Sequence, residues 1–288
     1  MNPYVIITDS ACDIVPEMLA EWGVRCQSLS VRFDHIDKDF LDGEMPVTEF
    51  YQTMRDGHVA KTSAVNAEAF RTLFTEELDK GYDVLYIGFS SGLSTTSVQA
   101  EVAASELREQ YPDRKIITVD TLAASAGFGL IVYLAVEKKN TGATIEEVEA
   151  YVREALPNLC HWFTVDDLVY LKRGGRVSPA VALVGGMLSI KPVMHVDDEG
   201  HLTKVGTVRG RKKSLEELAN RFAELALDPA NGVIFISHGD CMDDVNLLCD
   251  MLKARGGNDV KVITHVGTVI GAHSGPGTMA LFFLGKNR

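Results

Sequence analysis

Short apolar runs alternate with stretches of helical periodicity along the first half of the chain. Three runs, each leading into a loop rich in small polar residues, are predicted strands: residues 4–8, 84–89 and 115–119. The helix predicted between the first two carries large apolar residues at the spacing of one face: Phe70, Leu73, Phe74 and Leu78. Asn66 is a suitable N-cap for this helix, and Gly81 follows its end. This order of strands and helices predicts a parallel α/β sheet.

Two further helices are predicted from capping boxes, in which a hydroxyl residue is followed three positions later by glutamate. Thr144 with Glu147 forms one such pair, and Ser214 with Glu217 forms the other. Residues 123–136 are apolar on nearly all sides of a helix. Because a surface helix keeps one polar face, we expect this segment to be a helix buried in the core.

The pattern changes after about residue 156. Residues 191–206 are typical of a β-hairpin whose turn holds the polar residues 197–200. A helix, a strand, a second helix and a second strand follow, with the strands predicted at residues 232–237 and 260–266. We therefore predict an α/β protein of two domains, with its ligand bound between them. The domains are a doubly wound N-terminal domain and a second α/β domain: residues 1–156 and 157–288.

Composition and charge restrict the partners. The chain has 288 residues, of which 46% are hydrophobic, enough to bury a substantial core. Lys and Arg together number 28 and Asp and Glu 40, which gives a formal net charge of −12. A chain this acidic is not expected to have nucleic acid or an anionic membrane surface as its main partner.

The cysteines and the N-terminus indicate a cytoplasmic protein. The five cysteines are scattered and include no C-x-x-C pair, so neither a disulfide framework nor a zinc site is expected. The N-terminus has no basic region and cleavage site, so no signal peptide is predicted. The longest uncharged stretch, residues 121–136, is shorter than the ~20 residues that cross a bilayer, so stable membrane insertion is not expected.

Two hydroxyl-rich loops lie in the N-terminal half. Residues 8–13 directly follow the first predicted strand, which is where α/β proteins bind ligands, and residues 61–66 precede a predicted helix. Helix capping is the alternative explanation for both loops. In the first loop, Asp13 would then accept hydrogen bonds from free N–H groups of the next helix.

A third loop, residues 88–96, carries Ser90, Ser91 and Ser94 between a strand and a helix. Seryl hydroxyls and the free N–H groups of a helix N-terminus can together bind an anion such as a carboxylate. The loop carries several hydroxyl residues, whereas a catalytic site with one activated serine would need only one. The loop therefore favours anion binding.

The same loop supports an alternative function, a serine esterase. Gly88-Phe89-Ser90-Ser91-Gly92 satisfies G-x-S-x-G, the pattern of the nucleophile elbow of α/β hydrolases. Asp120 or Asp240, followed by His273, would complete the order of a Ser-Asp-His triad. The short pattern also arises easily by chance.

A fourth loop is predicted near the C-terminus, at residues 271–277. Its glycines and proline surround His273 and Ser274 and predict a rigid loop rather than a strand. A lone histidine is more often structural than functional. A histidine held in a rigid loop is a stronger candidate for ligand binding.

Two segments are basic although the chain is acidic: residues 171–178 and 208–213. They contain four arginines of interest: Arg173, Arg176, Arg209 and Arg211. Cations at a helix N-terminus oppose the helix dipole, so residues 211–213 are placed there at some cost. A ligand that carries phosphate or an acidic partner would offset this cost, whereas the alternative is an ordinary solvated surface.

Together these segments resemble the DegV family, the fatty-acid-binding subunits of bacterial fatty acid kinase. The ordered motifs that carry the resemblance span nearly the whole chain: Thr8-Asp9-Ser10, Thr62-Ser63, Ser90-Ser91-Gly92-Leu93-Ser94, Val119-Asp120-Thr121, Leu171-Lys172-Arg173-Gly174-Gly175-Arg176, Lys191-Pro192 and His273-Ser274-Gly275-Pro276-Gly277. Two positions depart from the usual pattern, namely Ala64-Val65 after Thr62-Ser63 and Thr95 after Ser94. Neither departure removes a residue expected to bind the ligand.

The resemblance implies that a long-chain fatty acid is buried between two α/β domains. Its carboxylate is expected to be held by Thr62, Ser94 and His273. Because a buried carboxylate needs donors, we also hypothesise that His273 donates to it in the protonated form. The neighbouring Ser63, Ser90, Ser91 and Ser274 are further candidate ligand-binding residues. In this family a separate ATP-dependent kinase phosphorylates the carboxylate, and the acyl phosphate enters phospholipid synthesis. The binding subunit itself is not an enzyme.

The resemblance also assigns a role to the basic segments. Arg173, Arg176, Arg209 and Arg211 are expected to face the kinase or the acyl phosphate. No cofactor or metal is expected, because the chain has neither H-E-x-x-H nor a G-x-x-x-x-G-K-[ST] phosphate loop. A third possibility, a phosphotransferase component for a polar metabolite, would need a polar cleft, whereas residues 123–136 and 181–184 predict apolar walls.

Overall fold

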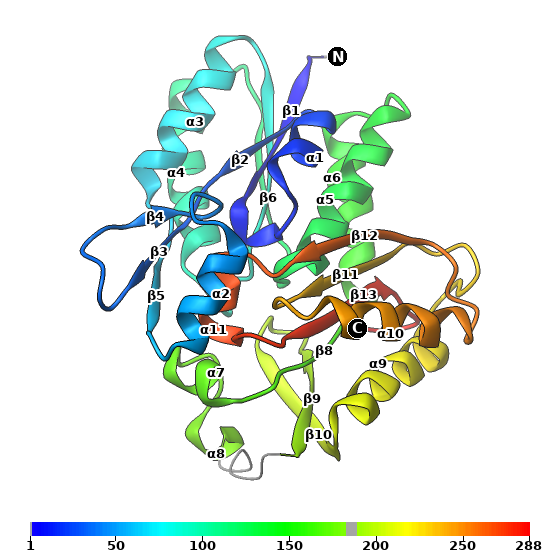
Figure 1. Cartoon of the computed structure of the whole chain (residues 1–288). Helices are drawn as coiled ribbons and strands as arrows, with labels where there is room; N and C mark the ends of the chain where they lie inside the picture. The colour runs from blue at the N-terminus through cyan, green and yellow to red at the C-terminus, as the bar shows by residue number, and fades with distance from the viewer. Residues whose placement is uncertain (1, 183–188) are drawn as a thin grey trace.

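The structure is a computed structural model, which describes residues 2–182 and 189–288 (Figure 1). Its described strands form three sheets. A four-stranded parallel sheet has the order β2-β1-β6-β7, and a six-stranded mixed sheet has the order β10-β9-β8-β13-β11-β12. A small antiparallel sheet has the order β4-β3-β5. Leu183 and Val184, part of the predicted apolar wall at residues 181–184, lie outside the described residues.

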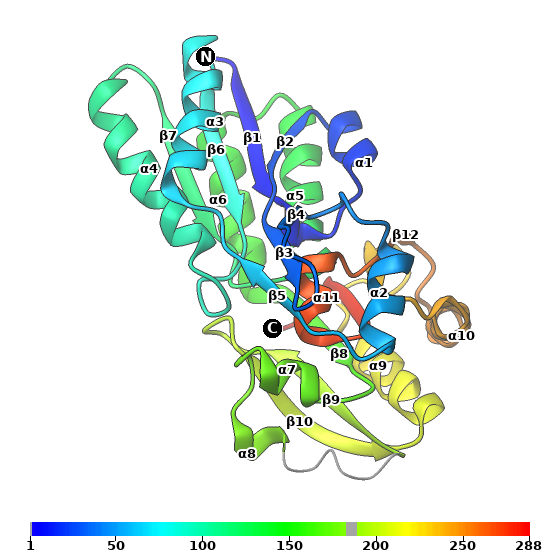
Figure 2. The ribbon, with the colours of Figure 1, turned by 60° about the vertical axis from the view of Figure 1, so that its left-hand side comes forward.

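The parallel sheet is the centre of the N-terminal half. Its strands are β1 (Tyr4–Asp9), β2 (Val24–Gln27), β6 (Asp83–Gly88) and β7 (Ile116–Asp120). The three predicted strands are confirmed to within one residue. Helices α3 and α4 pack together on one side of the sheet, and α5 and α6 on the other (Figures 1 and 2). The sheet is therefore doubly wound, as expected.

Two helices of this half, α3 and α6, begin at their predicted capping residues. The helices of this half are α1 (Pro16–Glu21), α2 (Val47–Arg55), α3 (Ala67–Asp79), α4 (Thr96–Gln110), α5 (Ser125–Asn140) and α6 (Ile145–Ala155). The Asn66 side chain accepts from the backbone N–H of Ala69 at 2.9 Å and caps α3. Thr144 and Glu147 form both bonds of the predicted capping box.

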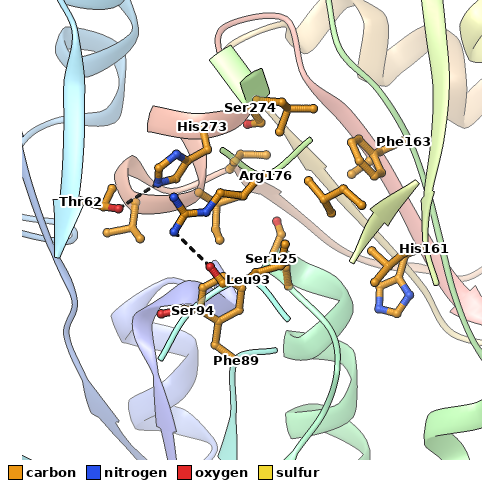
Figure 3. A pocket seen from close by; sticks show the side chains of 18 of the residues that line it. Thr62, Phe89, Leu93, Ser94, Ser125, His161, Phe163, Arg176, His273 and Ser274 are labelled. Carbon is orange, nitrogen blue, oxygen red and sulfur yellow. Dashed lines mark hydrogen bonds between the residues drawn. The ribbon is translucent and has the colours of Figure 1, made fainter. Parts of the chain in front are cut away.

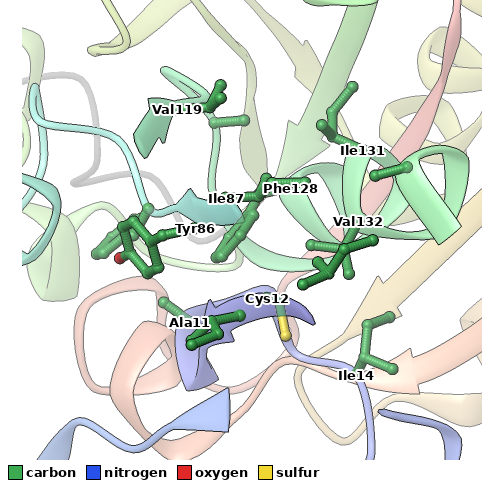
Figure 4. Close-up of a cluster of buried hydrophobic side chains, with 14 of the residues drawn as sticks. Ala11, Cys12, Ile14, Tyr86, Ile87, Val119, Phe128, Ile131 and Val132 are labelled. Atoms are coloured by element: carbon green, nitrogen blue, oxygen red, sulfur yellow. The ribbon is translucent and has the colours of Figure 1, made fainter. Parts of the chain in front are cut away.

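The predicted core helix is confirmed as α5. Its buried residues lie on all sides of the helix, because it packs against β6 on one side and against β11 and β13 on the other. Figure 4 shows Phe128, Ile131 and Val132 of α5 among side chains of the parallel sheet and of the 3-10 helix Ser10–Cys12, including Ile87. This helix therefore joins the cores of the two larger sheets.

The six-stranded sheet contains the strands of the C-terminal half. They are β8 (Leu159–Thr164), β9 (Ile190–Val196), β10 (Leu202–Arg209), β11 (Ile234–His238), β12 (Val260–His265) and β13 (Met279–Leu284). β9 and β10 form the predicted hairpin. β11 and β12 are parallel, whereas β13 runs antiparallel between β8 and β11. The domain boundary at residue 156 stays a prediction, since α5 contacts both halves.

One predicted helix start in this half is wrong. The helices are α7 (Val169–Arg173), α8 (Pro179–Ala182), α9 (Arg211–Leu225), α10 (Met242–Lys253) and α11 (Thr268–Ser274), with a 3-10 turn at Leu156–Asn158. α9 begins one turn before Ser214, since Gly210 turns the chain out of β10 with a φ of 94°. Ser214 is buried inside the helix, where its hydroxyl donates to the Arg211 carbonyl at 2.8 Å.

The small sheet was not predicted. It consists of β3 (Ser30–Phe33), β4 (Phe40–Leu41) and β5 (Ala60–Ser63). β5 was expected to be a loop, because residues 60–63 show no alternation of apolar and polar side chains. It forms a strand because it pairs with β3, and α11 from the far end of the chain packs against both strands. This contact brings the C-terminal histidine segment next to residue 62.

None of the helices within residues 2–182 and 189–288 has both the length and the apolar character needed to cross a membrane.

Candidate ligand cavity

A cavity of about 510 Å³ lies where the two halves of the chain meet. Its walls come from both halves and are mainly apolar, and they include Phe89, Leu93, Phe163, Leu202, Val269 and Phe282. Thr62, Ser94 and His273 lie together at one end, whereas Phe163 and His161 lie at the other (Figure 3). A volume of this size and a largely apolar lining are typical of sites for small organic ligands.

Thr62 and His273 are in direct contact at the polar end. The Thr62 hydroxyl lies 2.8 Å from Nε2 of His273, although the two residues are 211 positions apart. Thr62 comes from β5 and His273 from the last turn of α11. His273 was expected in a loop, but residues 268–274 are helical and the loop begins at Gly275, whose φ is 81°. The glycines therefore end a short helix instead of forming the histidine loop.

The imidazole of His273 is held in a tight and partly dehydrated environment. Burial, together with the nearby Arg176, lowers its pKa from the usual 6.5 to about 4. This direction favours a neutral ring at pH 7 and opposes the protonated form expected from the sequence. Gly174 lies so close to the ring that a Cβ there would be 2.1 Å from Nδ1. A glycine at position 174 is therefore what allows the ring to occupy this position.

Ser94 belongs to the loop between β6 and α4 and lines the cavity. Its hydroxyl lies 2.9 Å from the Thr96 hydroxyl and accepts from the Thr96 backbone N–H at 3.2 Å. Thr62, Ser94 and His273 thus all line the cavity, as the resemblance implied, and they come from three separate segments. The buried Ser274 also lines it, and within the described part of the chain its hydroxyl has no hydrogen-bond partner.

Arg176 lies at the same end of the cavity. Its guanidinium donates to the Leu93 carbonyl at 3.0 Å and to the Gly174 carbonyl. These bonds connect the segment after α7 to the loop that carries Ser94. Arg176 also lines the cavity, so it brings a positive charge to this end, and its predicted role toward phosphate or a partner stays a prediction.

The other three arginines lie outside the cavity lining. Arg173 is exposed and its guanidinium lies 5.7 Å from the centre of the Tyr170 ring, and Arg209 is exposed at the end of β10. Arg211 is in the first turn of α9, where its Nε lies 2.9 Å from the Asp244 carboxylate. This acidic neighbour offsets the unfavourable helix dipole, so Arg211 does not require a phosphate ligand.

The remaining predicted serines differ in position. Ser91 is exposed and lines the cavity, whereas Ser63 is exposed outside the lining. Ser63 follows Thr62 on β5, and consecutive residues of a strand point to opposite faces. Ser90 is fully buried outside the lining, and its hydroxyl donates to the Gly200 carbonyl at 2.9 Å. Ser90 therefore connects the loop to the β9–β10 hairpin.

These positions oppose the esterase alternative. The partner of Ser90 is a backbone carbonyl, while His273 contacts Thr62. Asp120 accepts from the backbone N–H groups of Ser91 and Leu122, and Asp240 pairs with Arg55 at 2.5 Å. The residues that would form the triad are thus engaged in separate structural contacts.

The motif that follows β1 has a structural role. The buried Asp9 accepts from the Tyr86 hydroxyl at 2.6 Å and from the Phe89 N–H at 3.0 Å, which fixes the start of the Ser94 loop. Burial raises the Asp9 pKa to about 6. Asp9, not the predicted Asp13, caps the following 3-10 helix. Asp13 instead lies in the left-handed region, with a φ of 54°, and accepts from Ser125.

Sequence reasoning missed several polar residues of the cavity wall, including Ser125, His161 and Thr278. Ser125 begins α5 and contacts Ser237 through its hydroxyl at 2.8 Å. His161 lies in the middle of β8. A histidine within an otherwise apolar strand was the available signal, but the direction of its side chain could not be known before the strand was placed in the sheet.

Among the residues that the structure describes, two groups of side chains have a spacing that could hold a metal ion: Asp34, His35 and His58, and Asp197, Glu199 and His201. Both groups lie on the surface outside the cavity lining. They therefore do not contribute to the candidate site.

The family is shown by comparison with known sequences. Residues 3–286 match the sequence model of the DegV family, which is described as a family of uncharacterised proteins. This chain belongs to the DegV family. A DegV domain-containing protein of Clostridium perfringens is 40% identical over 289 residues, which cover 100% of this chain and 99% of the relative. The resemblance based on the ordered motifs is confirmed.

Solved DegV structures share the whole fold. One is a DegV family protein from Thermus thermophilus that is described as binding fatty acid. It is 31% identical to this chain with a TM-score of 0.89, and the match covers 98% of this chain and 99% of that protein. A stearic acid-binding protein from Eubacterium ventriosum has 26% identity and a TM-score of 0.88, covering 98% of each chain. The two-domain α/β fold that this chain shares with these DegV proteins is thereby confirmed.

Proposed function

We propose that this protein binds a long-chain fatty acid and presents its carboxylate to a separate ATP-dependent fatty acid kinase. The kinase would form an acyl phosphate that feeds phospholipid synthesis. The observation that carries the proposal is the cavity, which has apolar walls and polar side chains gathered at one end. The fatty acid binding described for the Thermus thermophilus relative supports it.

The apolar walls suit an acyl chain energetically. Each buried methylene contributes roughly 0.8 kcal/mol, so a chain of about sixteen carbons gains on the order of 11 kcal/mol before losses. Ordering the flexible chain takes back part of this gain. The remainder is enough for the ligand to stay bound during purification.

The polar end suits a carboxylate. A buried carboxylate without donors costs several kcal/mol, which is why it needs hydrogen bonds. Thr62 and His273 already lie 2.8 Å apart, so with Nε2–H donating to the Thr62 hydroxyl, the hydroxyl proton is free for a carboxylate oxygen beside them. Ser94 supplies a further hydroxyl, and the Arg176 guanidinium supplies positive charge at the same end. The charge on Arg176 makes a protonated His273 unnecessary.

The exposed arginines outside the cavity are the proposed contact with the kinase. Arg173 belongs to α7, three residues before Arg176, and is exposed. An exposed charge steers a partner without taking part in the buried site. We expect Arg173→Glu to lower acyl phosphate formation by a purified kinase while fatty acid binding is retained. Equal loss of both would show that Arg173 supports the fold instead.

We place this function in the cytoplasm and give the chain no catalytic role. All five cysteines are free, which suits a reducing compartment. ATP and the phosphoryl transfer would belong to the kinase. A serine-directed probe and an activated ester test this directly, because only an esterase would be labelled or show turnover.

The first experiment is mass spectrometry of an organic extract of the purified, denatured protein. Close to one fatty acid per chain is expected, and its length and unsaturation would describe the cavity. An extract without fatty acid, together with no uptake of added fatty acid, would contradict the proposal.

A further inference from the structure

His161 lies on the wall of the cavity far from the polar end (Figure 3). Side chains of β8 alternate between two faces, so His161 and Phe163 point to the cavity while Cys160 and Trp162 pack in the separate core of the six-stranded sheet. The imidazole is buried, with 2% of the residue exposed. It therefore occupies a position where an apolar side chain is normally expected.

Neither ring nitrogen of His161 has a hydrogen-bond partner among the residues that the structure describes. A neutral imidazole carries one donor and one acceptor, and leaving both unmatched inside a protein is costly. Burial and the nearby Arg288 hold the pKa of His161 well below its usual value, so the ring is neutral. A ligand group that reaches the ring would supply the partners that the described residues do not.

Phe282 and Gly127 pack against the His161 ring. The Phe282 ring meets the imidazole edge-on with the centroids 5.9 Å apart. Gly127 of α5 lies beside both rings, where a Cβ would be 2.7 Å from Cδ2 of the imidazole and 2.5 Å from Cδ1 of Phe282. A phenyl ring could make the same kind of contact without burying unmatched nitrogens. Packing alone therefore does not account for a histidine at this position.

We propose that the preferred ligand is a hydroxy fatty acid, whose chain hydroxyl hydrogen-bonds to His161 while its carboxylate occupies the end formed by Thr62 and His273. This inference rests on the proposed function and narrows its ligand class. A hydroxyl both donates and accepts, so it matches a neutral imidazole in either tautomer. A keto oxygen matches only the N–H, and a methylene matches neither nitrogen.

The test compares affinities of the delipidated full-length protein for octadecanoic acid and for three hydroxyoctadecanoic acids. Their hydroxyls are placed near the carboxylate, in mid-chain and near the methyl end. We expect at least one isomer to bind about tenfold more tightly than octadecanoic acid, since it satisfies buried groups that the plain chain leaves unmatched. Equal or weaker binding of all three isomers would overturn the inference, while binding of octadecanoic acid would leave the proposed function intact.

Two variants separate the hydrogen bond from the shape of the side chain. His161→Phe keeps a ring but removes both nitrogens, and we expect the ratio of the two affinities to fall to about one. His161→Gln restores a donor and an acceptor and should recover part of the preference. Thermal unfolding checks that both variants are folded. A preference that persists in His161→Phe would contradict the role of the histidine, whereas no binding of any fatty acid to the wild-type protein would overturn the proposed function itself.

Discussion

The two ends of the cavity are built in opposite ways. At the polar end, side chains from distant segments already contact one another, as Thr62 does with His273 and Arg176 with the Leu93 carbonyl. At the other end, His161 packs against the Phe282 ring and neither of its nitrogens is matched by the described residues. Side chains that already contact one another can bind the carboxylate, which all fatty acids share. A side chain without a hydrogen-bond partner instead favours those fatty acids that carry a matching polar group. We therefore expect changes at the polar end to affect every fatty acid, and changes at the far end to affect the choice among them.

The largest expected effect on affinity is that of His273→Ala. It removes the contact with Thr62 and leaves a buried carboxylate with fewer donors, so affinity should fall by about tenfold or more. The loss should be similar for fatty acids of different length and unsaturation, as measured by competition binding. A loss confined to one chain type would mean that the two ends are not separate in function.

The low pKa of His273 predicts a change in stability with pH. The ring titrates near 6.5 in the unfolded chain and near 4 in the folded one, so the unfolded chain binds more protons between these values. The free energy of unfolding should therefore decrease as pH falls through this window, with about 1–3 kcal/mol from this residue. Other buried histidines add to the slope, so the measurement is the difference between wild type and His273→Gln in urea unfolding. Identical slopes would contradict the assignment.

Gly174→Ala should act on the polar end without removing a polar group. The added Cβ would meet Nδ1 of His273, and the ring or the Gly174 backbone must move. We expect all fatty acids to bind about fivefold more weakly, with little change in the ranking of their affinities. Gly175→Ala is not a suitable control, because its φ of 72° strains any side chain. Gly206→Ala is a suitable control, since a Cβ at position 206 meets no atom within 4 Å and the φ of Gly206 is not in the left-handed region.

Phe163→Leu tests the far end. Phe163 lines the cavity on the same face of β8 as His161. A smaller, more flexible side chain should change the relative affinities for straight and bent acyl chains by a few-fold. Competition binding with a saturated and an unsaturated acid of equal length measures the change. A uniform loss for both acids would show that Phe163 supports the site as a whole.

The smallest effect is expected from Ser63→Ala. Ser63 is exposed and outside the cavity lining, although it follows Thr62 directly in the chain. Its substitution should leave fatty acid affinity within about twofold of wild type, while Thr62→Val, which removes only the hydroxyl, weakens binding. Comparable losses in the two variants would mean that the face of β5 toward the ligand is wrongly assigned.

Much of the fold could be predicted from local patterns. The three parallel strands, the hairpin and the helix α5 follow from apolar periodicity and turn residues, which are properties of neighbouring positions. β5 could not be predicted because residues 60–63 form a strand through pairing with β3. The helix start expected at Ser214 was wrong because Gly210 turns the chain into α9 one turn earlier.

The candidate site was predictable in its residue types but not in its geometry. Thr62, Ser94 and His273 were identified through ordered motifs, and all three line the cavity. Ser63 and Ser90 belong to the same motifs yet lie outside the lining, because strand alternation and a bond to Gly200 direct them elsewhere. His161 carried no motif at all. That its ring nitrogens have no partner among the described residues became known only from the tertiary structure.

Local sequence information was sufficient for the class of fold, the order of its main elements and the hydroxyl, arginine and histidine segments of the site. These features depend on residues close together in the chain. Tertiary structure alone decided that α11 lies beside β5, that Arg176 joins the polar end while Arg211 pairs with Asp244, and that His161 faces the cavity. The reason is that contacts between distant segments depend on how whole strands and helices pack, which no local pattern specifies.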